Sequence, residues 1–337
     1  MRVSAGLPRI ERVDDLIDAR LAARLDRLDV RSTKLFPGKL LGERRSKRRG
    51  QSVEFDDFRP YVAGDDLRFI DWNAYARLDR LIVKLFLEEE DLAVHIALDA
   101  SASMRAGSGD ETKVLYGARL AMALGYIGLI NQNRVGMSVF GAPVSKDPKQ
   151  RAIMHVPEMR GRHRIKHIGQ FLIDSLFDED SSTLPAGVSA MGPMAGGEFN
   201  SALTSIARTR TGRGVFVLVS DFLVPGGYEQ GLRALATRRG YDIFCVQLLA
   251  PAELEPEREA QVGLAGDLRL TDAETGRSAE VTITPELVKR YKERLEAYCE
   301  RLRAFCLARG MAHMLVRTDT ALDQLVMDTL RRRGLVG

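Results

Sequence analysis

The chain has 337 residues, of which 45% are hydrophobic and 28% charged, and its net charge is +4. That composition is typical of a soluble globular protein and excludes a disordered or fibrous chain. The length allows one large domain, or one domain with a smaller module. No segment reaches the roughly 18 uninterrupted apolar residues of a membrane span, and the N-terminus lacks the apolar run of a signal sequence, so we expect a cytoplasmic protein.

The N-terminal part of the chain divides into a helix and a small module. Apolar residues between Arg9 and Leu28 recur at a spacing near 3.6, which predicts an amphipathic helix within residues 1–30. Residues 31–91 hold short apolar runs separated by Gly and Pro, which predict a β-rich module. The basic run Arg44–Arg49 leaves nucleic-acid binding open as an alternative function, although no aromatic residues interleave with it.

Residues 92–337 alternate between apolar strands and helices, which predicts an α/β fold. The predicted elements are strand Ala93–Leu98, helix Thr112–Asn131, strands Arg134–Phe140 and Ala152–Val156, helices His163–Leu176 and Phe199–Thr209, strand Val215–Ser220, helix Gly227–Arg238, strand Tyr241–Leu249, helix Pro285–Arg309, strand Ala312–Val316 and helix Leu322–Arg331. This order favours a doubly wound, mostly parallel sheet with helices on both faces. A turn-rich pair of strands predicts a hairpin insertion near residues 262–283.

The stretch Val94–Met104, VHIALDASASM, ends a predicted buried strand in one carboxylate and two hydroxyls, those of Asp99, Ser101 and Ser103. Asp221 follows a second apolar strand, and the carboxyl ends of parallel strands meet at one edge of a sheet, where ligands bind. These oxygen ligands favour Mg²⁺ or Mn²⁺ over zinc or copper. The alternative is structural, because Asp and Ser in such turns also cap the helix that follows.

The same residues resemble a known metal site. Asp99-Ala100-Ser101-Ala102-Ser103, together with Asp221, is similar to the metal-ion-dependent adhesion site (MIDAS) of von Willebrand factor A-like domains. The preceding block, residues 50–90, resembles the bacterial domain-of-unknown-function family 58 (DUF58), and this resemblance covers roughly residues 44–246. The matching residues in the block are Glu54, Phe55, Arg59, Tyr61, Gly64, Asp65, Arg68, Ile70, Asp71, Trp72, Ala76, Arg77 and Glu88.

The resemblance implies a von Willebrand A-like domain that binds Mg²⁺ and a protein partner. In that pattern a further ligand, usually Thr, comes from a Gly-Gly-Thr loop, but the matching loop here is Gly196-Gly197-Glu198-Phe199-Asn200 and has no Thr. Glu198 or Asn200 is therefore the candidate for the remaining oxygen ligand. The family resemblance also implies a MoxR-type AAA+ ATPase as the partner, in the assembly, maturation or stress handling of other proteins.

A second candidate surface lies in the small module, in the stretch from Gly64 to Trp72. Arg68, Asp71 and Trp72, the sole tryptophan, are candidates for partner binding, because Trp and Arg are frequent anchors of interfaces. The structural alternative, which we favour, is that ion pairs between arginines and carboxylates fix the module against the von Willebrand A-like domain. Its predicted members are Arg59, Arg68 and Arg77 with Asp65, Asp71 and Glu88.

These patterns predict a non-enzymatic interaction protein. In the predicted mechanism the serines and aspartates hold Mg²⁺, and one coordination position is left for an acidic side chain of the partner. The rival hypothesis is a Mg²⁺- or Mn²⁺-dependent phosphoester hydrolase, supported by the acidic edge and nearby Arg105. Against the hydrolase stand the lack of a Gly-rich phosphate loop and of a His base beside the motif.

Overall fold

The computed structural model of the chain describes residues 10–32, 45–46, 54–89, 92–105, 109–143, 151–177, 189–190, 199–210, 213–237, 240–257, 267–271, 278–282 and 284–337. The chain forms two compact units. The large unit joins Met1–Leu35 to Leu92–Gly337, and the small unit is Phe36–Asp91. The N-terminal helical segment therefore belongs to the large unit.

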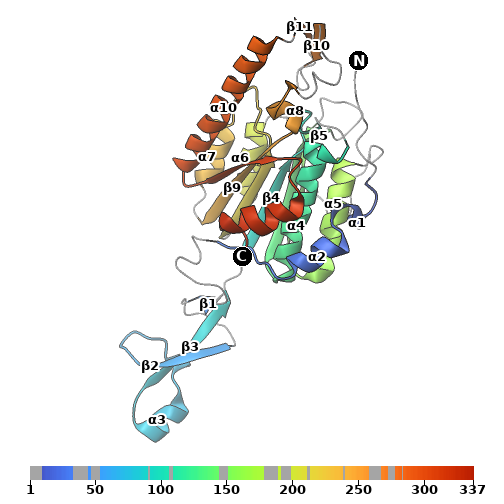
Figure 1. Cartoon of the computed structure of the whole chain (residues 1–337). Helices are drawn as coiled ribbons and strands as arrows, with labels where there is room; N and C mark the ends of the chain where they lie inside the picture. The colour runs from blue at the N-terminus through green and yellow to red at the C-terminus, as the bar shows by residue number, and fades with distance from the viewer. Residues whose placement is uncertain are drawn as a thin grey trace. The chain divides into compact units, whose positions relative to one another are not determined.

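Among the described residues, a sheet of seven strands forms the centre of the large unit, in the order β12-β9-β8-β4-β5-β6-β7 (Figure 1). Neighbouring strands from β12 to β5 pair in parallel, and β6 and β7 add antiparallel pairs at one side. The expected α/β fold with a mostly parallel sheet is confirmed. The strands are β4 Ala93–Asp99, β5 Arg134–Pro143, β6 Arg151–Met159, β7 Ser189–Ala190, β8 Gly214–Ser220, β9 Tyr241–Leu249 and β12 Ala312–Arg317.

Helices cover both faces of this sheet. The described helices of the large unit are α1 Val13–Leu16, α2 Ala19–Leu25, α4 Lys113–Ile130, α5 Ile165–Leu176, α6 Phe199–Thr209, α7 Glu229–Thr237, α8 Pro251–Leu254, α10 Pro285–Leu307 and α11 Leu322–Gln324, followed by the π-helical segment η5 Leu325–Leu330. Short 3₁₀ turns are η2 Ser103–Arg105, η3 Gly109–Glu111 and η4 Arg162–Arg164. Figure 1 shows α6, α7 and α10 on one face and α4 and α5 on the other.

Alternate residues of the central strands pack on opposite faces of the sheet. Val94, Ile96 and Leu98 of β4 join the hydrophobic cluster that includes α4 and α5. Ala93 and Ala97 join the second cluster, with α6 and α7. Because both faces are covered, the central strands are mostly apolar, and every residue of β4 and β8 is buried.

The single helix expected between Arg9 and Leu28 is instead two short helices, α1 and α2. The break falls at Asp18, whose carboxylate accepts a hydrogen bond from the Leu21 N–H at 2.6 Å and caps α2. Leu16 and Leu25 are buried in the same cluster as α4. The apolar spacing does not reveal this break, because an N-cap aspartate also fits the polar face of a continuous helix.

Helix α4 is the one described helix whose length and composition suit a membrane span, but 89% of that apolar window is buried inside the structure. Two glycines let α4 approach the sheet closely. A Cβ at Gly117 would lie 2.7 Å from a methyl of Leu98, and one at Gly128 would lie 2.6 Å from a methyl of Val135. Helix α4 is therefore the core helix of the large unit.

The small unit contains an antiparallel sheet in the order β1-β3-β2 and one short helix. Its described elements are β1 Arg45–Ser46, β2 Glu54–Pro60, the 3₁₀ turn η1 Leu67–Phe69, α3 Trp72–Leu78 and β3 Ile82–Glu89. Helix α3 buries none of its residues. Unlike α4 and α5 of the large unit, it therefore contributes little to a core.

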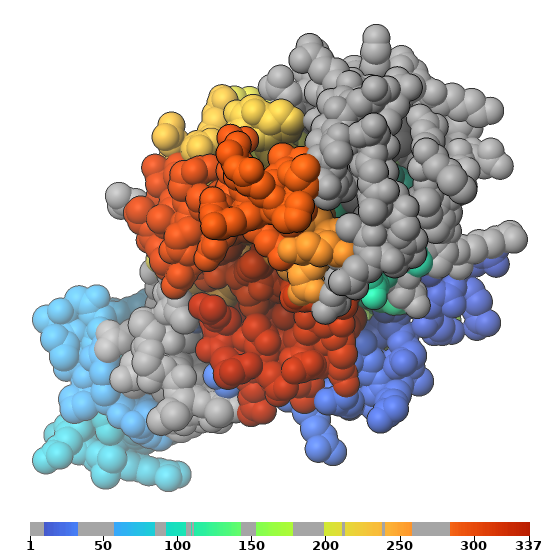
Figure 2. All heavy atoms as spheres, turned by 45° about the horizontal axis from the view of Figure 1, so that its top comes forward, coloured from blue at the N-terminus to red at the C-terminus, as the bar shows by residue number. Residues whose placement is uncertain are grey.

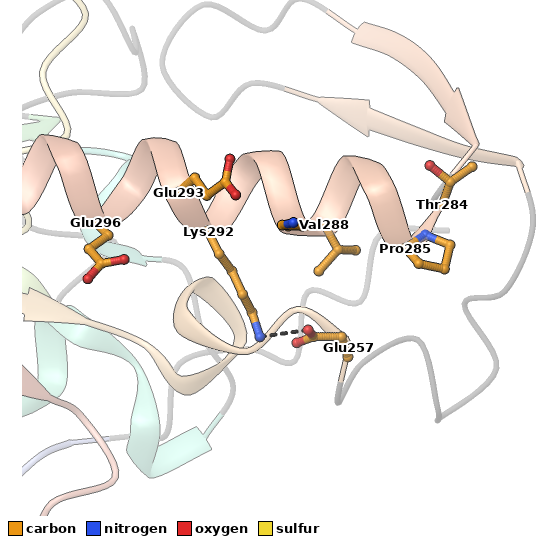
Figure 3. A pocket seen from close by; sticks show the side chains of 8 residues that line it. Glu257, Thr284, Pro285, Val288, Lys292, Glu293 and Glu296 are labelled. Carbon is orange, nitrogen blue, oxygen red and sulfur yellow. Dashed lines mark ion pairs between the residues drawn. The ribbon is translucent and has the colours of Figure 1, made fainter.

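Two antiparallel strands, β10 Asp267–Thr271 and β11 Ser278–Thr282, lie where the sequence predicts a hairpin insertion. Helix α10 follows and is capped by Thr284, whose hydroxyl accepts a hydrogen bond from the Leu287 N–H at 3.2 Å. A groove of about 470 Å³ runs beside the first turns of α10, where Lys292 pairs with Glu257 at 2.6 Å (Figure 3). Figure 2 shows α10, in orange and red, at the surface of the large unit.

Candidate functional site

Strands β4 and β8 bring Asp99 and Asp221 to one edge of the sheet. The two strands are parallel neighbours with Leu98 opposite Val219, so Asp99 at the end of β4 lies close to Asp221 just after β8. The two aspartates are buried, at 3% and 1% exposure. The structure thus places together two residues that the sequence predicts to meet. We call this place, with Ser101 and Ser103, the Asp99–Asp221 edge.

The Asp99 carboxylate is held by hydrogen bonds from Ser101 and Ser220. Its Oδ1 accepts a hydrogen bond from the Ser101 N–H at 2.9 Å, and its Oδ2 accepts one from the Ser220 hydroxyl at 2.6 Å. Burial, followed by the nearby Asp221 carboxylate, raises the pKa of Asp99 to about 6. Ser101 and Ser103 are partly exposed, and their hydroxyl oxygens lie 3.2 Å apart. The turn therefore buries its carboxylate and leaves its hydroxyls closer to the surface.

Gly141 of β5 supports this turn, and sequence reasoning missed it. Its φ of +81° lies in the region that favours glycine. A Cβ at Gly141 would lie 3.0 Å from the backbone nitrogen of Ser101 and 3.3 Å from Oδ1 of Asp99. Next to it, the carbonyl of Phe140 accepts a hydrogen bond from the Ala100 N–H at 2.8 Å. The neighbouring strand therefore holds the Asp99 turn in place, and a side chain at Gly141 would disturb it.

Lys113 brings a buried positive charge to the Asp99–Asp221 edge. It begins α4, its side chain is fully buried, and its Nζ lies 2.7 Å from Oδ2 of Asp221 and 2.5 Å from Oε1 of Glu253. Burial by itself lowers the pKa of Lys113, but Asp221 and Glu253 outweigh burial, so the pKa is raised above its ordinary value. The sequence does carry a signal for this buried lysine. Lys113 is the first residue of an apolar helix, and the other charged residue of that helix is Arg119.

The segment that carries Asp221 is fixed from several sides. Oδ1 of Asp221 accepts a hydrogen bond from the Leu223 N–H at 2.9 Å, so both carboxylate oxygens have a donor. The backbone carbonyl of Asp221 accepts a hydrogen bond from Gln247 of β9 at 3.1 Å. The next residue, Phe222, has a φ of +58°. Its backbone carbonyl accepts a hydrogen bond from the Tyr298 hydroxyl of α10 at 2.5 Å. Asp221 is therefore held in one position by β9, α4 and α10.

Of the two candidates for a further metal ligand, the structure describes Asn200 but not Glu198. The side-chain amide of Asn200 donates a hydrogen bond to the Gly227 carbonyl and accepts one from the Gly231 N–H, each at 2.7 Å. Asn200 therefore joins α6 to α7, and its two polar atoms are occupied there. Glu198 lies outside the described residues, as does the basic run Arg44–Arg49 apart from Arg45 and Ser46.

The described residues do not fit a divalent cation bound to Asp221. Mg²⁺ requires octahedral oxygen ligands at about 2.0–2.1 Å. An ion on Asp221 would lie next to the Lys113 ammonium, which is 2.7 Å from the same carboxylate, and two cations so close repel strongly in a buried setting. Within the described part of the chain, no group of three or more His, Cys, Asp or Glu side chains is placed to hold a metal ion. The structure brings the predicted ligands Asp99 and Asp221 together beside a lysine.

The residues predicted for partner binding in the small unit are of two kinds. Asp71 is 9% exposed and caps α3, accepting hydrogen bonds from the N–H groups of Asn73 and Ala74, each at 3.0 Å. It also pairs with Lys84 at 3.2 Å, so its contacts are structural. Trp72 is 60% exposed, and the exposed side chain of Arg68 pairs with its neighbour Asp66 at 2.7 Å. Trp72 and Arg68 are therefore accessible, whereas Asp71 holds the helix.

The ion pairs of the small unit differ in part from the predicted set. Arg59 pairs with Asp65 at 2.5 Å, as predicted, and both side chains are mostly buried. Arg68 pairs with Asp66, and Asp71 pairs with Lys84, where the sequence offered other partners. Arg68 and Asp66 are only two residues apart, so this pair forms locally. The side chain of Glu88 lies outside the described residues.

Fold and site together define a mixed α/β protein with a mostly parallel sheet and two buried aspartates at the carboxyl edge of that sheet. Residues 57–300 match the family described as "Protein of unknown function DUF58". The chain therefore belongs to the DUF58 family.

Several mycobacterial relatives match most of the chain. It is 27% identical over 322 residues to the uncharacterized proteins Mb1516 of Mycobacterium bovis and Rv1480 of Mycobacterium tuberculosis, which covers 95% of this chain and 92% of each relative. Among solved structures, it is 14% identical to the conserved hypothetical protein BatB from Bacteroides thetaiotaomicron, with a TM-score of 0.38 over 72% of this chain and 98% of that chain. An aerotolerance-related membrane protein from Bacteroides fragilis matches at 15% identity and a TM-score of 0.34, with the same coverage of 72% and 98%.

Proposed function

We propose that this DUF58 protein is a non-enzymatic interaction protein that docks on a protein partner through α3 of its small unit. The proposed partner is the MoxR-type AAA+ ATPase that the family resemblance implies, and the proposed location is the cytoplasm. The proposed role is in the assembly, maturation or stress handling of other proteins. For the large unit we propose a von Willebrand A-like fold, which the strand order and the helices on both faces of the sheet support.

The observation that carries this proposal is a helix with exposed aromatic residues and no buried one. Trp72, Tyr75 and Leu78 of α3 are 60%, 41% and 60% exposed. Residues spaced by three lie next to one another on a helix, and the rings of Trp72 and Tyr75 meet edge to face at 6.2 Å. Exposed apolar surface of this kind marks sites of protein interaction, and Trp and Tyr are frequent hot spots.

Residues around α3 enlarge this surface and keep it ordered. Val62 and Leu67 are 60% and 59% exposed. The Asp71 cap fixes the start of α3, and the Arg59–Asp65 pair fixes the loop that precedes it. A surface that is ordered before binding loses less conformational entropy when the partner arrives. These contacts therefore support a role for α3 as a preformed docking face.

Binding of the full chain to a MoxR-type ATPase from the same organism, measured by isothermal titration calorimetry, tests the proposal. Trp72→Ala and Tyr75→Ala are each expected to weaken binding by roughly tenfold or more, the effect of losing an interface anchor. Tyr291→Ala is the matched control, because Tyr291 of α10 is 40% exposed in the large unit. Wild-type affinity in both α3 variants contradicts the proposal.

The competing hypotheses give different results in the same preparation. An affinity for the ATPase that requires Mg²⁺ favours capture through the Asp99–Asp221 edge over docking through α3. Turnover of phosphoesters that requires Mg²⁺ or Mn²⁺ and is abolished by Asp99→Asn favours the hydrolase. Under our proposal, chelation of divalent ions leaves the affinity unchanged and no such turnover is seen.

A further inference from the structure

The buried ammonium of Lys113 is the unexpected group at the Asp99–Asp221 edge. Lysine is almost never fully buried unless it is paired, and here two carboxylates contact it, at 2.7 Å from Asp221 and 2.5 Å from Glu253. The side chains of Lys113, Asp221 and Glu253 are 0%, 2% and 19% exposed. They come from the start of α4, the residue just after β8 and helix α8, so three separate segments meet at one charge.

The balance of charge explains why a cation is needed at this place. Asp99 and Asp221 are buried close together, and the negative charge of one disfavours the ionised form of the other. Taking carboxylates out of water is costly unless an opposite charge lies close to them. In a metal-binding edge a divalent ion supplies that charge. In this protein Lys113 supplies it from within the chain.

The distances around Nζ are close to those of a cation site. Divalent ions bind carboxylate oxygens at about 2.0–2.6 Å, and the two oxygens that contact Lys113 are 2.7 Å and 2.5 Å from its nitrogen. Without the lysine side chain, the oxygens of Asp221 and Glu253 would each need to move by about 0.4–0.7 Å to reach the distances of about 2.0–2.1 Å that Mg²⁺ requires.

We infer that Lys113 is the resident cation of the Asp99–Asp221 edge and that its ammonium holds the position a divalent ion would otherwise take. The Asp221 carboxylate is thereby closed to Mg²⁺ and Mn²⁺, so the two aspartates do not together hold an ion that could coordinate an acidic side chain of a partner. Because the ammonium is covalently part of the chain, the charge balance does not depend on ion concentration. The inference stands independently of whether α3 binds the ATPase.

Direct measurement of Mn²⁺ binding to the full-length protein is the first test. Free Mn²⁺ gives an electron paramagnetic resonance signal that disappears when the ion is bound. Wild-type protein is expected to leave the signal of added micromolar Mn²⁺ unchanged. Stoichiometric uptake of Mn²⁺ by the wild-type protein, lost in Asp221→Asn, overturns the inference. This test needs no partner, so its outcome is separate from that of the docking experiment.

The second test removes the lysine. Lys113→Ala is expected to lower Tm by roughly 10 °C, because it leaves buried carboxylates without their counter-charge. It is also expected to take up Mn²⁺, and millimolar Mg²⁺ is expected to raise its Tm but not that of the wild type. Lys292→Ala is the control, because Lys292 makes an exposed ion pair with Glu257.

A wild-type Tm in Lys113→Ala overturns the inference, because the ammonium then stabilises nothing. A folded Lys113→Ala protein that takes up no Mn²⁺ also overturns it, because the vacated position then does not suit a cation. Where Lys113→Ala fails to fold, the Mn²⁺ measurement on the wild-type protein decides alone.

Discussion

The Asp99–Asp221 edge and the surface of α3 use their side chains in opposite ways. At the edge, charged groups that are typical of a binding motif are buried, and Lys113 contacts both Asp221 and Glu253. On α3, aromatic and apolar side chains that are typical of a core are exposed to solvent. The comparison teaches that a motif shows which residues meet, whereas burial and pairing decide whether they are available to a partner.

The largest expected effect is at the edge. Asp221→Ala leaves Lys113 buried with Glu253 as its one remaining carboxylate contact, and we expect a loss of about 3–5 kcal/mol in the free energy of unfolding. Urea unfolding followed by circular dichroism measures it. Glu257→Gln, which removes an exposed ion pair with Lys292, is the control and is expected to leave stability unchanged. Equal stability of the two variants would remove the contrast between the edge and the surface.

Two glycines with positive φ sharpen the comparison between the units. Gly141→Ala is expected to cost about 2–3 kcal/mol, because the new Cβ adds a contact of 3.0 Å with Ser101 to the backbone strain at φ +81°. Gly64→Ala in the small unit is expected to cost about 1 kcal/mol, because its φ is +104° but no atom lies within 4 Å of the new Cβ. Chemical denaturation of both variants measures the difference. A larger cost at Gly64 would show that strain alone, and not support of the Asp99 turn, sets the effect.

Acid is expected to lower the free energy of unfolding of the large unit, because His313 is partly buried in its neutral form. This residue contacts Gln247, which in turn binds the Asp221 carbonyl. Burial, followed by Arg303 and Arg333 and opposed by Glu300, lowers the pKa of His313 from 6.5 to about 4. The unfolded chain therefore takes up the proton first, and stability present above pH 6.5 is lost as pH falls toward 4.

The free energy of unfolding, measured from neutral pH down to about pH 4, tests this prediction. His313→Gln is expected to lose less stability with acid than the wild type. The raised pKa of Asp99 acts in the opposite direction in both proteins, so the difference between them isolates His313. His163→Gln is the control, because His163 is exposed. Parallel curves for wild type and His313→Gln contradict the prediction.

The smallest expected effect on stability is at α3. Trp72→Ala is expected to change the free energy of unfolding by less than about 1 kcal/mol, because most of the side chain is already exposed. The same variant is expected to weaken partner binding, so its two effects separate function from stability. A large loss of stability would instead make Trp72 part of the core of the small unit. Thermal unfolding compared with Tyr75→Ala measures this.

Much of the fold could be predicted from the sequence because its signals are local. The apolar runs of β4 and β8 and the helical periods between them indicate a parallel sheet, and that sheet is present. The meeting of Asp99 and Asp221 follows from the same topology. The break between α1 and α2 was not predicted, because Asp18 fits both a cap and the polar face of one longer helix.

By itself, the sequence determined that the sheet is mostly parallel and that two aspartates meet at its carboxyl edge, because the alternation of apolar strands and helices is a property of the chain. Only the tertiary structure decided what neutralises those aspartates. Lys113 is 108 residues from Asp221 and 140 from Glu253 in the sequence, so no local pattern joins them. Their contact depends on how α4 and α8 pack at the edge.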